Sequence, residues 1–155
     1  MKFKNTETLT LVSNSGGRTE ETRKRKIIET SNFKNEIGAY VIRYKSHKIP
    51  RFSGYSSILK IGCTTDGFQN RFKNYNHQSD MTVVGTDLLE CLKVRSQKTN
   101  VRLMHFLAHV DHPDEIVIDF YSSDEEHSPE ELEYALIKDY FLAHNELPPL
   151  NFGMK

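Results

Sequence analysis

The stretch that decides the fold is residues 38–62, which read GAYVIRYKSHKIPRFSGYSSILKIG. Two runs rich in apolar and aromatic residues, 37–44 and 56–62, are typical of strands, and the polar stretch with proline and glycine between them is typical of a connection. The sequence therefore predicts two neighbouring strands. Each strand carries one polar side chain whose role must be explained, Tyr40 on the first strand and Lys60 on the second.

A chain of 155 residues is long enough for one domain with a real core and too short for two. No apolar run reaches the length of a membrane helix, and the polar N-terminus lacks the apolar core of a signal peptide. The two cysteines have no paired spacing. We therefore expect a reduced, cytoplasmic protein that does not contact a membrane.

The formal net charge of zero hides a gradient along the chain. Residues 1–77 hold 15 Lys and Arg against 6 Asp and Glu, whereas residues 111–146 hold 1 Lys against 12 Asp and Glu. A basic half is suited to a polyanion such as nucleic acid. Two solvated faces explain the same charges, so charge alone does not decide the function.

The pattern of elements predicts a folded domain at 37–155 behind an N-terminal extension at 1–36. The extension is polar, with a short strand expected at 9–12 and a short helix at 19–29. Segments 86–94 and 102–110 each suit either a strand or a helix, and the apolar run at 115–122 suits a strand.

Two helices have recognisable signals. The first follows the second strand, with Thr65 or Asp66 as its N-cap and Phe68 and Phe72 on its apolar face. The second begins at the sequence SPEE, where Ser128 is the N-cap of a capping box, and it ends near residue 145, before two prolines. We therefore expect an α/β fold, a small, mostly antiparallel β-sheet flanked by helices.

Five short segments follow one another along these elements: GAYV at 38–41, LKIG at 59–62, RFKNY at 71–75, EYALIKDY at 133–140 and the asparagine of LPPLN, Asn151. In this order they resemble the motifs of the GIY-YIG nuclease superfamily. Its members carry Gly-Ile-Tyr on one strand, Tyr-Ile-Gly on the next, an arginine on the following helix and a glutamate on a later one. Two features depart from the family pattern: Lys60 replaces the second tyrosine, and the link between the two motifs is longer.

The resemblance implies a metal-dependent endonuclease that hydrolyses DNA phosphodiester bonds with Mg²⁺ or Mn²⁺. It implies that Tyr40 takes a proton from the attacking water, that Arg71 binds the phosphate and that Glu133 holds the metal ion. The remaining members of the expected catalytic set are Lys60, Tyr75 and Asn151.

These residue types suit that chemistry. Mg²⁺ usually keeps several waters, so one carboxylate can suffice to hold it, and a guanidinium binds phosphate with two parallel hydrogen bonds. A free phenol has a pKa of about 10, so Tyr40 needs a nearby cation to act as a base. Our hypothesis is that Lys60 or Arg71 supplies that charge. Strand alternation is expected to point Lys60 away from both Leu59 and Ile61.

Several basic residues are expected to contact DNA: Arg43, Lys45, Lys48, Arg51 and Lys73. Because the domain is small, we expect target recognition to need a second copy or a partner that reads the sequence, and double-strand cleavage to need two copies. The replacement at Lys60 favours an alternative, a catalytically impaired nucleic-acid-binding module on the same fold. A third possibility is a structural or interaction domain that keeps only the fold.

Overall fold

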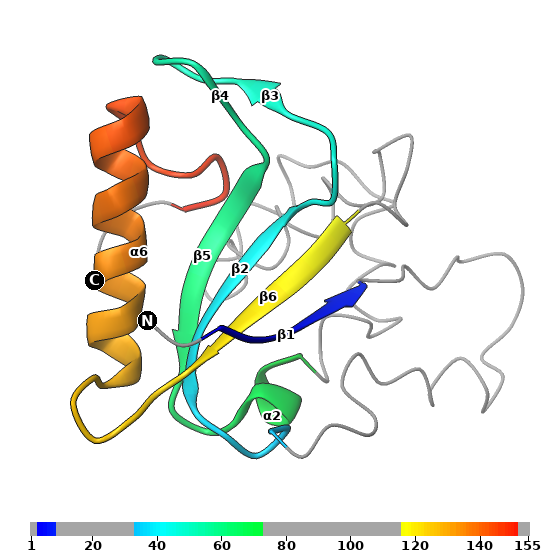
Figure 1. Ribbon diagram of the computed structural model, residues 1–155, viewed down its shortest axis with the longest axis vertical. Helices are drawn as coiled ribbons and strands as arrows, with labels where there is room; N and C mark the ends of the chain where they lie inside the picture. The colour runs from blue at the N-terminus through cyan, green and yellow to red at the C-terminus, as the bar shows by residue number, and fades with distance from the viewer. Residues whose placement is uncertain (1–2, 9–32, 73–115, 152–155) are drawn as a thin grey trace, which may run out of the picture.

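The computed structural model of the chain describes residues 3–8, 33–72 and 116–151 (Figure 1). Several sequence predictions lie outside these ranges: the strand at 9–12, the helix at 19–29 and the two ambiguous segments at 86–94 and 102–110. The expected site residues Lys73 and Tyr75 also lie outside them.

A four-stranded sheet in the order β1-β6-β2-β5 forms the centre of the described fold, and every strand pair in it is antiparallel. Its strands are β1 (Phe3–Thr8), β2 (Gly38–Tyr44), β5 (Ile58–Thr64) and β6 (Ile116–Ser122). The mixed α/β class and the mostly antiparallel sheet are thereby confirmed. So is the prediction that the strands carrying Tyr40 and Lys60 are neighbours.

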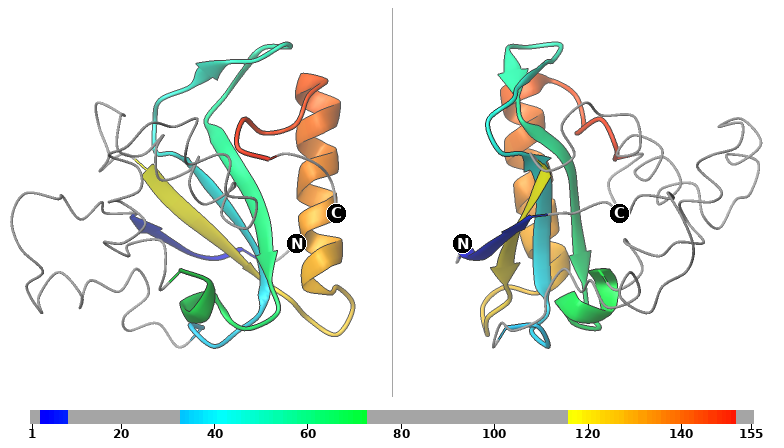
Figure 2. Two further views of the ribbon diagram at one scale, coloured as in Figure 1. Left: turned by 180° about the vertical axis from the view of Figure 1, so that it is seen from behind. Right: turned by 90° about the vertical axis from the view of Figure 1, so that its right-hand side faces the viewer.

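The connection between β2 and β5 folds back on itself as a small hairpin. Its two short strands, β3 (Ile49–Pro50) and β4 (Tyr55–Ser56), pair with each other and not with the main sheet. Figure 1 shows this hairpin at one end of the molecule, beyond the ends of β2 and β5, and the views in Figure 2 agree.

Part of the N-terminal extension belongs to the folded domain. β1 pairs with β6 along the outer edge of the sheet, and Phe33 packs in the core against Phe68 and Phe120. The described strand at residues 3–8 therefore precedes the segment, 9–12, that the sequence favoured. Its polar sequence, FKNTET, is that of an edge strand with little apolar content, which the apolar pattern does not detect.

Two helices pack on opposite faces of the sheet. On one face, Phe68 and Phe72 of α2 (Phe68–Phe72) join a cluster with Tyr40, Ile42 and Phe120. On the other face, Ile137 and Tyr140 of α6 (Pro129–His144) pack on Val41 and Ile61. Neighbouring residues of β2 therefore contact different helices, as strand alternation requires.

The N-terminus of α6 is as predicted. The Ser128 hydroxyl accepts from the Glu131 N–H and the Glu131 carboxylate accepts from the Ser128 N–H, which completes the capping box. The helix ends at Asn145 in the left-handed conformation.

The N-terminus of α2 differs from the prediction. Neither Thr65 nor Asp66 caps the helix, because the N–H groups of Phe68 and Gln69 donate to the backbone carbonyls of Glu36 and Lys34. The segment just before β2 therefore satisfies the helix end, a tertiary contact that local sequence does not reveal.

Candidate functional site

The glycines of the two motifs, Gly38 and Gly62, lie so close to neighbouring atoms that a side chain at either position would clash. A Cβ on Gly62 would lie 2.4 Å from the hydroxyl oxygen of Tyr40, which is its partner in the strand register. A Cβ on Gly38 would lie 2.0 Å from the carbonyl oxygen of Tyr121 on β6. The Tyr40 side chain therefore crosses over Gly62, toward the outer edge of β5.

Arg71 meets Tyr40 at that place. Its Nε donates to the Tyr40 hydroxyl at 3.1 Å, and its guanidinium carbon lies 5.8 Å from the centre of the Tyr40 ring. The ring itself is buried and packs edge-on against Phe72 at 4.7 Å between centroids, whereas Arg71 is exposed. Tyr40 is thus fully buried, its hydroxyl included, and the exposed Arg71 covers the phenol oxygen.

Glu133 approaches the same strand from the other face. It lies half-buried in α6 and acts on the thiol of Cys63, the residue after Gly62. Burial first, and then Glu133 as an acceptor for the thiol proton and as a negative charge, raise the pKa of Cys63 to about 12, with a smaller contribution from Glu130. Arg71 acts on the same thiol in the opposite direction, lowering its pKa. The charges of Glu133 and Arg71 therefore both act on Cys63.

These side chains gather at one edge of the sheet because β5 is its last strand among the residues that the structure describes. Tyr40 and Arg71 come from the α2 side, Glu133 comes from the α6 side, and Gly62 and Cys63 lie between them. Cys63 is not among the site residues that the sequence predicts. Its position in the sequence, next to Gly62, could have indicated it. Consecutive strand residues face opposite sides of a sheet, so if Gly62 lies under Tyr40, Cys63 faces the other side.

Lys60 lies on the Tyr40 face and is 4% exposed. It is the register partner of Ile42, which belongs to the same cluster as Tyr40. The expectation that Lys60 points away from Leu59 is wrong, because the register shifts between Ile42 and Arg43 and places Leu59 in that cluster too. Lys60 does point away from Ile61, which packs under α6.

Asn151 holds the edge of β5. Its Oδ1 accepts from the Ile61 N–H at 2.9 Å and its Nδ2 donates to the Ile61 carbonyl at 2.8 Å. Next to it, the Leu150 N–H donates to the Leu59 carbonyl. Asn151 thus occupies the hydrogen-bonding positions of an additional strand, which is a structural role.

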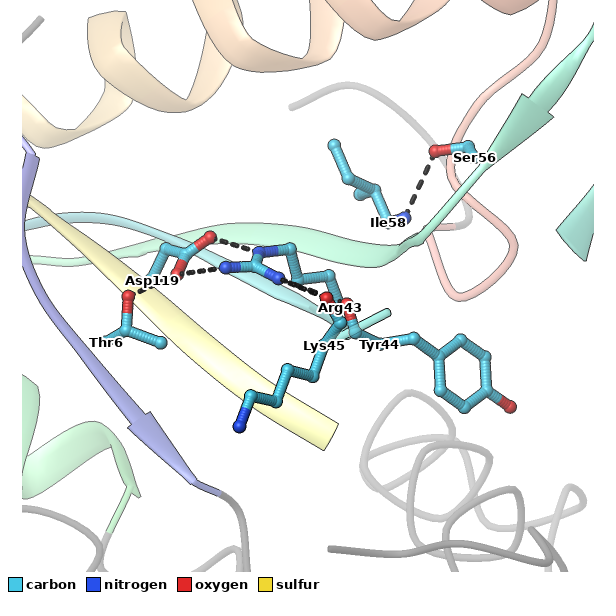
Figure 3. A network of polar contacts seen from close by, with 7 residues as sticks. All are labelled: Thr6, Arg43, Tyr44, Lys45, Ser56, Ile58 and Asp119. Atoms are coloured by element: carbon cyan, nitrogen blue, oxygen red, sulfur yellow. Dashed lines mark hydrogen bonds and ion pairs between the residues drawn. The ribbon is translucent and has the colours of Figure 1, made fainter. Parts of the chain in front are cut away.

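Arg43 is bound within the sheet. Its Nε and Nη2 donate to the two carboxylate oxygens of Asp119 at 2.5 and 3.1 Å, and Asp119 also accepts from the Thr6 hydroxyl at 2.7 Å (Figure 3). The ion pair joins β2 to β6, and Thr6 adds β1. Because the guanidinium is engaged by a carboxylate inside the protein, this placement fits a structural role and not the expected contact with DNA.

Arg51 is held in a similar way. It forms an ion pair with Glu146 at 2.7 Å and donates to the Leu147 carbonyl at 3.1 Å, both just after α6. Lys45 and Lys48, by contrast, are exposed on the connection between β2 and β3. Of the expected DNA contacts that the structure describes, these two lysines are the ones available to an anion.

The donor set allows a magnesium-type ion but does not enclose one. Among residues 3–8, 33–72 and 116–151, no three His, Cys, Asp or Glu side chains are grouped to hold a metal ion. Glu133 offers one half-buried carboxylate, which is the kind of ligand Mg²⁺ takes together with waters and substrate phosphate. Cys63, with its pKa near 12, is a neutral thiol at pH 7 and so is not a thiolate ligand.

None of the helices described here is both long and apolar enough to cross a membrane. No family model, curated protein or solved structure matches the chain.

Proposed function

We propose that this protein is a metal-dependent endonuclease of the GIY-YIG type, which hydrolyses phosphodiester bonds in DNA. One observation carries the proposal: Arg71 donates to the Tyr40 hydroxyl across Gly62, and Glu133 reaches Cys63, the next residue of the same edge strand. A phenol, a guanidinium and a carboxylate that are far apart in the sequence thus come to one edge of the sheet.

Each group has a defined part in the proposed reaction. The guanidinium of Arg71 stabilises negative charge, both on the Tyr40 oxygen and on a phosphate bound beside it. The Tyr40 oxygen accepts the proton of the attacking water, which must approach from the exposed side of Arg71 because the Tyr40 ring is buried.

Glu133 is the group that would hold a magnesium-type ion at this edge, with waters and phosphate oxygens as the other ligands. When bound, such an ion neutralises charge on the phosphate and on the departing oxygen. In this proposal the neutral thiol of Cys63, whose pKa Glu133 raises, donates to the Glu133 carboxylate and orients it, in the way that outer hydrogen bonds orient metal ligands.

A nicking assay on supercoiled plasmid with Mg²⁺ or Mn²⁺ tests the proposal. Glu133→Gln keeps the shape of the side chain and removes its charge, and we expect the nicking rate to fall about 100-fold or more. Glu130→Gln is the matched control, an exposed glutamate one turn earlier on the same helix, and it should leave the rate unchanged. Nicking that survives Glu133→Gln would contradict the proposal.

A second candidate is a nucleic-acid-binding module that has lost catalysis. The observation that favours it is the complete burial of Tyr40, together with the nearly buried Lys60 where the family has a tyrosine. DNA binding and plasmid nicking, measured on the same protein preparation, distinguish the binding module from the nuclease. DNA binding without nicking, under either metal ion, supports the binding module, and nicking that depends on Glu133 supports the nuclease.

A further inference from the structure

The β3–β4 hairpin presents the two most exposed large aromatic side chains of the described fold. Phe52 is 86% exposed and Tyr55 is 68% exposed. The hairpin tip is closed by a hydrogen bond from the Arg51 N–H to the Gly54 carbonyl, and Gly54 has a φ of 72°, a left-handed conformation that suits glycine in a tight turn. A phenylalanine at such a tip is unusual, because exposing its ring to water is unfavourable.

The backbone beneath these rings is anchored to the end of α6. The Phe52 N–H donates to the Glu146 carboxylate at 2.5 Å, and His144 Nδ1 lies 2.7 Å from the Ser53 carbonyl oxygen. The ion pair of Arg51 with Glu146 adds a third contact. Residues 51, 52 and 53 of the turn are therefore tied to the end of α6 while Phe52 stays in solvent, so little backbone conformational entropy remains to be lost when the ring contacts a ligand.

The charge around the hairpin indicates what that ligand is. The whole connection at 45–57 contains three Lys and Arg and one His but no Asp or Glu. Since Glu146 offsets Arg51, the exposed Lys45 and Lys48 supply the excess positive charge. Exposed aromatic rings and lysines on one connection are residue types that bind a nucleic acid strand, with bases stacked on the rings and phosphates near the cations.

We infer that Phe52 and Tyr55 stack on unpaired bases of a nucleic acid strand while Lys45 and Lys48 contact its phosphates. The inference depends on the proposed function for its substrate class and adds a site remote from Tyr40. Four residues, about 13 Å, separate Tyr40 from Tyr44, where the connection begins. Figure 1 places the hairpin and α2 at opposite ends of the molecule. The stacked bases therefore lie several nucleotides from the phosphate at Arg71.

A second copy of the chain is the competing occupant of these apolar side chains. α6 carries further exposed apolar residues, Phe141 and Leu142 among them. An isologous contact through the hairpin would, however, bring two copies of the same basic connection together, which like charges oppose.

The chain has no tryptophan, which allows a direct test of stacking. In the Phe52→Trp variant, the new indole is the sole tryptophan, and we expect single-stranded oligodeoxythymidylate to quench its fluorescence in EDTA. The matched control is Phe141→Trp, an exposed position on α6 whose indole should not be quenched. Phe52→Ala and Tyr55→Ala should each weaken binding of the same oligonucleotide by about 5- to 150-fold, the usual range for a base stacked on an aromatic ring.

Either of two binding results would overturn the inference: an indole at position 52 that is not quenched at saturating oligonucleotide, or unchanged affinity in both alanine variants. Self-association in analytical ultracentrifugation that Phe52→Ala abolishes would also overturn it, in favour of the second copy. Because the binding tests contain no divalent ion, they are independent of cleavage. Quenching without plasmid nicking refutes only the nuclease, and nicking without quenching refutes only the stacking site.

Discussion

Glu133→Gln is expected to make the thiol of Cys63 react faster, which tests the placement of the candidate site without any assay of activity. The measurement uses a Cys91→Ser background, so that Cys63 is the single cysteine of the chain. The reagent is the neutral disulfide 4,4′-dithiodipyridine, whose reaction with thiolate is followed by absorbance.

The magnitude follows from the pKa of Cys63, which is raised from 9.0 to about 12. At pH 8.5 this leaves about a thousandth of the thiolate that an unperturbed thiol has. The remaining thiolate is about 15- to 30-fold more nucleophilic, because nucleophilicity rises with thiol pKa. The folded parent should therefore react about 30- to 60-fold more slowly than the same chain in urea, even before burial of the thiol slows it further.

Three variants should change the rate with predictable sign. Glu133→Gln removes a negative charge that disfavours the thiolate, so the pKa of Cys63 falls and the reaction accelerates. Glu130→Gln should accelerate it less, because the charge of Glu130 has a smaller effect on that pKa. Arg71→Gln removes the opposing positive charge, so the reaction should slow.

The unfolded chains provide the control, since all variants should react alike in urea. Equal rates in the folded parent and in Glu133→Gln would refute the reasoning, because Glu133 would then not be beside Cys63. Acceleration by Glu130→Gln alone would mean that the wrong glutamate of α6 has been assigned to the site.

Variants at three further positions test the fold that supports the site, each by urea denaturation. Asp119→Ala leaves the charge of Arg43 unpaired in a partly buried place and should destabilise the protein by about 3 kcal/mol. Asp119→Asn keeps a hydrogen-bond acceptor and should destabilise it less. Unchanged stability in Asp119→Ala would mean that the ion pair is dispensable. Gly62→Ala should cost about 1–3 kcal/mol and displace the Tyr40 ring, since the new Cβ would lie 2.4 Å from its hydroxyl oxygen; wild-type stability would contradict that close approach. Ser128→Ala should cost about 1 kcal/mol by removing the capping box of α6, and Ser128→Asp should restore most of it.

The sequence by itself determined the elements whose signals are local. Apolar strand patterns predicted β2, β5 and β6 to within two residues, and the capping box located the first turn of α6. In these cases the physical cause, strand alternation or satisfaction of helix N–H groups by nearby side chains, acts over a few residues and can be read from them. The motifs at 38–41 and 59–62 belong here too, since they point to the strand pair that carries Tyr40 and Lys60.

Other features depended on partners that are distant in sequence. The polar strand β1 is held by its pairing with β6, and the start of α2 is satisfied by carbonyls from the segment before β2. The basic residues show the same limit. Arg43 and Arg51 look like phosphate ligands in the sequence, but carboxylates from β6 and from the end of α6 neutralise them.

The candidate site depended partly on the sequence and partly on the tertiary structure. The sequence supplied the residue types, Tyr40, Arg71 and Glu133. Only the tertiary structure decided that β5 is an edge strand, that Tyr40 crosses over Gly62 to meet Arg71, and that Cys63 links Glu133 to the same place. The physical reason is that chemical type is a property of one residue, whereas proximity and pKa are set by packing and charge, which arise only when distant segments come together.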